Sequence, residues 1–95
     1  MALVFEWHET KARENRRRHG VSFDEAKTVF ADGGALVIPD PAHSVVEDRW
    51  LRLGISSLGR VLVVVYTERD GSIRLISARK ASRPEQTTYE EANRR

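Results

Sequence analysis

The chain has 95 residues, of which 40% are hydrophobic and 32% are charged, with 16 basic against 14 acidic side chains. This length predicts a single domain, residues 1–95, with one modest core, and the composition excludes a disordered chain. The absence of cysteine excludes disulfides, zinc–thiolate sites and thiol nucleophiles, and it suits a reducing cytoplasm. The N-terminal residues are too polar for a signal peptide, and no apolar run approaches the length of a membrane span, so we expect a cytoplasmic protein with no membrane partner.

The first predicted helix runs from about His8 or Glu9 to His19, where Gly20 supplies a left-handed end. Its sequence is unusual because it carries a dense basic block and almost no apolar stripe. Positive charge in the last turn complements the helix dipole, which is one explanation of the block. A polyanionic partner is the other, since a second basic cluster lies at residues 69–83.

The second predicted helix begins at Ser22, which with Glu25 forms the pattern of a capping box. An apolar stripe follows, and the sequence Asp32-Gly33-Gly34 ends the helix. Alternating or continuous apolar residues then predict four strands, at residues 35–38, 49–56, 60–67 and 73–80. A polar helix is expected from Arg83 or Pro84 to Asn93.

This order predicts an α+β fold with two N-terminal helices, a four-stranded antiparallel meander and a C-terminal helix. One face of the sheet is expected to pack under the second helix, and the other face can stay open.

The sequence contains no pattern typical of a metal site, a nucleotide-binding loop or a serine nucleophile. The remaining polar residues are arginine, lysine, histidine, tyrosine and a few carboxylates. This set suits cleavage of RNA, which carries its own nucleophile in the 2′-hydroxyl, so that no metal and no cofactor are required.

The strand at residues 73–80 carries two arginines that suit a phosphate. Strict alternation places Arg74 and Arg79 on opposite faces of the sheet, unless a bulge shifts the register. The alternative is that either arginine pairs with Glu47, Asp48 or Glu68 across the sheet. Tyr66 ends the central strand, where core packing is the alternative to a contact with RNA.

The sequence resembles the BrnT family, which are toxins of type II toxin–antitoxin systems. The resemblance covers nearly the whole chain, and its segments are Phe5-Glu6-Trp7, Lys11-Ala12, Arg18-His19-Gly20-Val21-Ser22-Phe23, Asp40-Pro41, His43-Ser44, Arg49-Trp50, Val64-Val65-Tyr66-Thr67-Glu68-Arg69 and Arg74-Leu75-Ile76-Ser77-Ala78-Arg79-Lys80-Ala81. The chain departs from the family pattern at His8, where aspartate is usual, and at Val45-Val46, where a more polar pair is usual.

The resemblance implies a RelE-like fold and a ribonuclease that blocks translation. It also implies neutralisation by a BrnA-like antitoxin with a ribbon–helix–helix domain, whose complex with the toxin binds operator DNA. In such a fold the basic helix is exposed, and we expect Asn15 and His19 to anchor it to the sheet by hydrogen bonds.

The catalytic prediction follows from the chemistry and from position within these motifs. Arg74 and Arg79 are expected to stabilise the transition-state phosphate, His43 or Glu47 to move protons, and Tyr66 to orient the substrate. Residues expected to bind RNA are Arg13, Arg16, Arg17, Arg49, Arg69 and Lys80. The alternative function is a non-catalytic module that binds RNA or protein.

Overall fold

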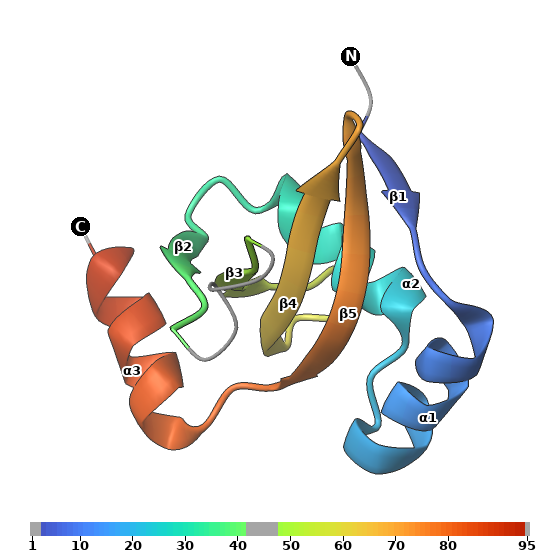
Figure 1. Ribbon diagram of the computed structural model, residues 1–95. Coiled ribbons are helices and arrows are strands. Elements are labelled where there is room, and N and C mark those ends of the chain that lie inside the picture. The colour runs from blue at the N-terminus through green and yellow to red at the C-terminus, as the bar shows by residue number, and fades with distance from the viewer. Residues whose placement is uncertain (1–2, 42–47, 95) are drawn as a thin grey trace.

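The structure is a computed structural model that describes residues 3–41 and 48–94 (Figure 1). In chain order its elements are β1 (Val4–Glu6), α1 (Glu9–His19), α2 (Phe23–Thr28), the 3₁₀ turn η1 (Val29–Ala31), β2 (Leu36–Pro39), β3 (Trp50–Ile55), β4 (Val61–Arg69), β5 (Ser72–Lys80) and α3 (Arg83–Ala92). In the described ranges, no helix combines the length and the apolar character that crossing a membrane needs.

The sheet has five strands in the order β1-β5-β4-β3-β2. The antiparallel pairing of β2, β3, β4 and β5 agrees with the predicted meander. The prediction of four strands was wrong, because β1 adds a fifth strand parallel to the start of β5, from the pair Val4–Ser72 to the pair Glu6–Arg74. A strand of three residues is too short to show an alternating pattern, and it precedes the two helices that were expected to begin the fold.

The core lies between one face of the sheet and the α2–η1 segment. Phe23, Ala26 and Val29 are buried against the row that Leu62 and Val64 provide on β4. Burial of such apolar side chains contributes most of the favourable free energy of folding.

The predicted capping box at α2 is only half formed. The Ser22 Oγ accepts a hydrogen bond from the Glu25 backbone N–H at 3.0 Å, as expected. The Glu25 carboxylate, however, faces away from Ser22. It accepts from the Arg60 Nε at 2.9 Å and from the Ser56 Oγ at 2.7 Å, so it ties α2 to the β3–β4 turn. Hydrogen bonds from Arg60 lower the pKa of this buried carboxyl.

A bulge in β5 changes which side chains share a face. Val65 pairs with Ser77 and Tyr66 pairs with Leu75, so Ile76 is an extra residue in β5. The alternation shifts by one position at this point. As a result Leu75 and Ala78 both point into the core, although residues three apart in a regular strand lie on opposite faces.

The second face of the sheet is partly covered by α3, which lies on the side opposite α1 and α2 (Figure 1). The Tyr89 hydroxyl donates to Asp32 Oδ2 at 2.6 Å, and the Asn93 side chain donates to the Gly34 carbonyl at 3.0 Å. Under the helix lies an apolar cavity of about 220 Å³, lined by Leu36, Ile38, Leu51, Leu53, Val63, Glu85 and Thr88. The expectation of an open second face therefore holds only beyond α3, toward β1 and β5.

Candidate functional site

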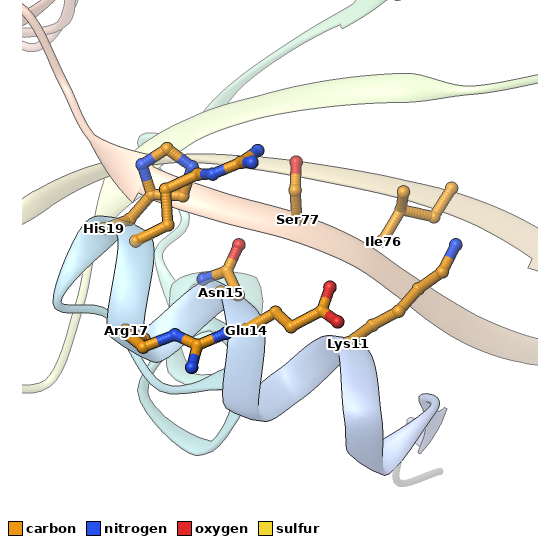
Figure 2. Close-up of a pocket in the computed structure, with 8 residues that line it drawn as sticks. Lys11, Glu14, Asn15, Arg17, His19, Ile76 and Ser77 are labelled. Atoms are coloured by element: carbon orange, nitrogen blue, oxygen red, sulfur yellow. The ribbon is translucent and has the colours of Figure 1, made fainter.

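A polar groove of about 490 Å³ lies between α1 and β5 (Figure 2). We call it the α1–β5 groove. It is lined by Lys11, Glu14, Asn15, Arg17, Arg18, His19, Ile76 and Ser77. Figure 2 shows Lys11 and Asn15 on the side of α1 that faces Ile76 and Ser77 across this groove. The two segments are far apart in the sequence, so the groove exists only in the folded chain.

The groove exists because Asn15 holds α1 against β5. Its side-chain Nδ2 donates to the carbonyls of Val21 at 2.9 Å and Ala78 at 2.8 Å, and its Oδ1 accepts from the Ala78 N–H at 3.0 Å. One amide therefore satisfies both backbone groups of Ala78, as a neighbouring strand would, beyond the point where β1 ends. The predicted anchoring role of Asn15 is confirmed, whereas the His19 side chain forms no hydrogen bond with the described part of the chain.

The charges in the groove are mostly positive. Lys11, Arg17 and Arg18 are exposed, and within residues 3–41 and 48–94 none of them forms an ion pair. Glu14 is the single carboxylate among the lining residues, and His19 is half-buried in the last turn of α1. Uncompensated cations around a polar hollow attract polyanions, and histidine is the side chain that most often transfers protons in enzymes.

Arg74 and Arg79 share one face of the sheet, because the bulge at Ile76 reverses the alternation between them. Arg74 pairs with Thr67, and Arg79 pairs with Val63, on the face that α3 partly covers. The condition under which both arginines were expected to reach one phosphate is therefore met by the backbone.

Both arginines have carboxylate partners other than those considered from the sequence. An Arg74 Nη1 lies 3.5 Å from Glu6 Oε1. The Arg79 guanidinium donates two parallel hydrogen bonds to Glu85, at 2.8 and 2.9 Å. These bonds hold the pKa of Glu85 at about 2 and raise the pKa of Arg79.

Ser77 connects the arginine face to the groove. It lies on the same face of β5 as Arg74 and Arg79, by its pairing with Val65, and it also lines the groove beside α1. The bulge at Ile76 brings about both positions. Ser77 is therefore the residue at which the arginine face meets the groove, whereas Arg74 and Arg79 themselves are not among the lining residues. We call the groove and the adjoining arginine face together the cationic edge.

The remaining catalytic candidates do not lie at this edge. Tyr66 is only 2% exposed and packs edge-on against Phe30 with ring centroids 4.9 Å apart. This position contradicts a contact with substrate, because the ring belongs to the core. His43 and Glu47 lie outside the described residues.

The predicted RNA-binding residues are also dispersed. Arg13, Arg16 and Arg17 are exposed on α1, but only Arg17 lines the groove. Arg69 lies at the end of β4, and Lys80 pairs with Leu62 at the end of β5, on the face opposite Arg79. Arg49 is half-buried and has interaction partners.

Sequence reasoning missed Lys11, Glu14 and Arg18 as parts of a site, and it gave His19 only an anchoring role. The available signal was spacing: residues 11, 14, 15 and 18 are three or four apart, so they share one side of a helix. The spacing alone does not show which element this side of the helix faces. No cluster of three or more potential metal ligands is found among the described residues.

Comparisons with known proteins agree with the fold and with the motifs. The sequence model of one family, described as "Ribonuclease toxin, BrnT, of type II toxin-antitoxin system", matches residues 7–85. The 1.1 Å crystal structure of the Brucella abortus ribonuclease toxin BrnT superposes with a TM-score of 0.68 and 24% identity, covering 86% of this chain and 100% of that chain. That likeness shows a shared fold. No curated protein matches the sequence. Since the family match spans most of the sequence, the chain belongs to the BrnT family of type II toxin–antitoxin ribonuclease toxins.

Proposed function

We propose that this chain is an endoribonuclease toxin that cleaves RNA without a metal ion and thereby inhibits translation. The observation that carries the proposal is the position of Ser77, which lines the cationic α1–β5 groove and also shares a face of the sheet with Arg74 and Arg79. Family membership supports the reaction class, and the charge of the edge supports an RNA substrate.

The proposed reaction uses the 2′-hydroxyl of RNA as its nucleophile. A proton leaves this hydroxyl as the oxygen attacks the adjacent phosphorus, and a second proton reaches the departing 5′-oxygen. His19 is the histidine at the groove, while His43 and Glu47 remain candidates for either transfer. Arg74 and Arg79 stabilise the added negative charge on the phosphate, and Lys11, Arg17 and Arg18 hold the flanking phosphates.

Arg79 must exchange its carboxylate partner for phosphate in this mechanism. The side chains of Arg79 and Glu85 are 43% and 34% exposed, so their ion pair lies at the surface. Exposed pairs of this kind contribute about 0–1 kcal/mol to stability. A phosphate monoanion or dianion that accepts two parallel hydrogen bonds can therefore replace Glu85 as the partner of Arg79.

The principal test compares Arg79→Ala with Glu85→Gln. If Arg79 serves the phosphate, Arg79→Ala loses toxicity and lowers the single-turnover rate of RNA cleavage about 10²-fold or more, with the fold retained. Glu85→Gln releases Arg79 and should keep the cleavage rate at least at its original level. Equal losses in both variants would instead assign Arg79 to the anchoring of α3, and full toxicity of Arg79→Ala would remove it from the mechanism.

A non-catalytic binding module is the second candidate function, and the bidentate Arg79–Glu85 pair favours it because the guanidinium is already occupied. Incubation of the pure protein with labelled RNA in EDTA separates the two functions. Cleavage that persists in EDTA supports the metal-independent enzyme. Binding without cleavage, with and without added magnesium, supports the module.

Membership in a type II family implies an antitoxin partner. We propose a BrnA-like ribbon–helix–helix protein that covers the cationic edge, with operator DNA bound only by the complex. Co-expression with a cognate antitoxin of this type should abolish toxicity. Addition of RNA should compete with the antitoxin for the toxin, and the toxin alone should not shift operator DNA.

A further inference from the structure

A second cavity lies on the opposite side of α1 from the α1–β5 groove. Its volume is about 170 Å³, and its lining residues are Trp7, Glu9, Ala12, Arg13, Arg16, Ser22, Phe23 and Asp24. Residues 9, 12, 13 and 16 repeat the three- and four-residue spacing that the groove uses at 11, 14, 15 and 18, but on the other side of the helix. The helix therefore has a polar hollow on each side of its buried stripe.

The aromatic wall of this cavity is rigid. Trp7 is half-buried and packs edge-to-face against the buried Phe23, with ring centroids 5.9 Å apart and an interplanar angle of 83°. This contact fixes the indole while part of it remains accessible. An immobilised, partly exposed aromatic ring is the platform on which single-stranded nucleic acids stack their bases.

The rim of the cavity carries both signs of charge. Arg13 and Arg16 contribute guanidinium groups, and Glu9 and Asp24 contribute carboxylates, all on exposed residues. In the described ranges none of the four takes part in an ion pair. Both kinds of group are thus available to a ligand, the guanidinium groups as stacking planes or phosphate donors and the carboxylates as acceptors.

The volume restricts what can bind. Sites for drug-sized molecules measure roughly 300–1,000 Å³. A cavity of about 170 Å³ has room for one ring system and not for a chain of nucleotides. A single nucleobase with its backbone outside is the ligand of matching size.

The carboxylates distinguish among the bases. Guanine presents two adjacent donors, N1–H and the N2 amino group, which match the two oxygens of one carboxylate. Adenine and cytosine present an amino donor beside an acceptor, and uracil presents one N–H between two acceptors, so a carboxylate meets repulsion in each of them.

We infer that this cavity is a specificity subsite that stacks one guanine of the RNA on Trp7 and reads its donor edge with Glu9 or Asp24. The inference rests on the proposed function, because the guanine belongs to the same RNA strand that the α1–β5 groove is proposed to hold, and that strand must cross α1 to reach this cavity. The helix is about 10 Å across, so the guanine belongs to a nucleotide near the scissile bond and not at it. The subsite thereby assigns Arg13 and Arg16 to recognition of the substrate and not to the chemical step.

The test uses the fluorescence of Trp7 in the Trp50→Phe background, where it is the remaining tryptophan. Titration with GMP, IMP, AMP and UMP needs no RNA cleavage. GMP should quench Trp7 with an affinity about tenfold above that of AMP and UMP, and IMP, which lacks the exocyclic amino group, should fall between them. Equal quenching by all four nucleotides, or none, would overturn the inference.

Variants of exposed side chains address the same point. The Glu9→Gln, Asp24→Asn double variant should reduce the affinity for GMP to that for AMP, while Glu90→Gln on α3 should leave the preference intact. In cleavage mapping, the double variant should continue to cut RNA but lose its preference for sites with a nearby guanine. Unchanged mapping would refute the subsite and leave the proposed function standing. Quenching by GMP in a protein that cuts no RNA would support the subsite and refute the enzyme.

Discussion

Asn15 explains how a helix with almost no apolar stripe can be part of a small protein. Three hydrogen bonds to backbone groups of Val21 and Ala78 replace the apolar contacts that normally hold a surface helix. Two of these bonds satisfy β5 at a buried edge position that β1 does not reach, so the same side chain both anchors α1 and closes the sheet.

Replacement of Asn15 by alanine should therefore be costly. It leaves buried carbonyl and N–H groups without partners, and each such group costs about 1–3 kcal/mol. We expect the free energy of unfolding of Asn15→Ala to fall by about 2–4 kcal/mol in urea denaturation. Arg17→Ala, on the exposed side of the same helix, should change it by less than about 0.5 kcal/mol. A loss in Asn15→Ala no larger than this control would show that other contacts hold α1.

At the scale of elements, α3 is attached mainly by polar contacts at its two ends. The Ser82–Glu85 capping box and the Arg79 ion pair hold its first turn. Tyr89 and Asn93 hold its last turns to the Asp32–Gly34 turn. Burial, together with the hydrogen bond to Asp32, raises the pKa of Tyr89 to about 12. These contacts make the attachment of α3 dependent on pH only outside the neutral range.

The acid limb of this dependence can be measured through Glu85. Its pKa in the folded chain is about 2, below the ordinary value of 4.5. A lowered pKa contributes stability that is complete above about pH 4.5 and is lost as the pH falls toward 2. In melting temperatures recorded from pH 6 to pH 2, Glu85→Gln should show a smaller acid-induced decrease than the original chain, whereas Glu90→Gln should follow the original curve. Identical curves for all three proteins would mean that the Arg79–Glu85 pair does not contribute.

At the scale of the whole molecule, the cationic edge should dominate the affinity for RNA. Each phosphate contact with single-stranded RNA contributes about 0.7 to the slope of log affinity against log salt. Lys11→Ala and Arg17→Ala should each reduce this slope by about 0.7, and Arg83→Ala at the start of α3 should leave it unchanged. The measurement is fluorescence anisotropy of a non-cleavable 2′-O-methyl oligonucleotide at several salt concentrations. An equal effect of Arg83→Ala would indicate diffuse binding instead of the α1–β5 groove.

Much of the fold was predictable from local signals. Gly20 and the basic last turn indicated the first helix, capping residues and apolar periodicity indicated the second, and turn residues separated the four strands of the meander. β1 was not predictable, since three residues carry too little pattern and parallel pairing depends on β5 being in place. The bulge at Ile76 was not predictable either, because alternation rules assume a regular ladder.

The candidate site was predictable only in its chemistry. The sequence indicated arginine-based phosphate chemistry, and the arginines of β5 do share one face of the sheet. The groove partners Lys11 and His19 depend on the approach of α1 to β5, which a buried asparagine determines. A polar residue at an inward helix position indicates a hydrogen-bonded contact but not the identity of its partner.

The cavity beneath α3 leaves the contact between this helix and the sheet incompletely packed. Thr88 borders a space of about 220 Å³ whose other walls are mainly aliphatic. Thr88→Leu should fill part of it and raise the free energy of unfolding by about 1 kcal/mol, since each buried methylene contributes about 0.8 kcal/mol and the lost hydroxyl contact to Pro84 is exposed. A higher melting temperature together with a slower cleavage rate would show that mobility of α3 contributes to activity. A higher melting temperature with an unchanged cleavage rate would show that this position can be used to stabilise the protein.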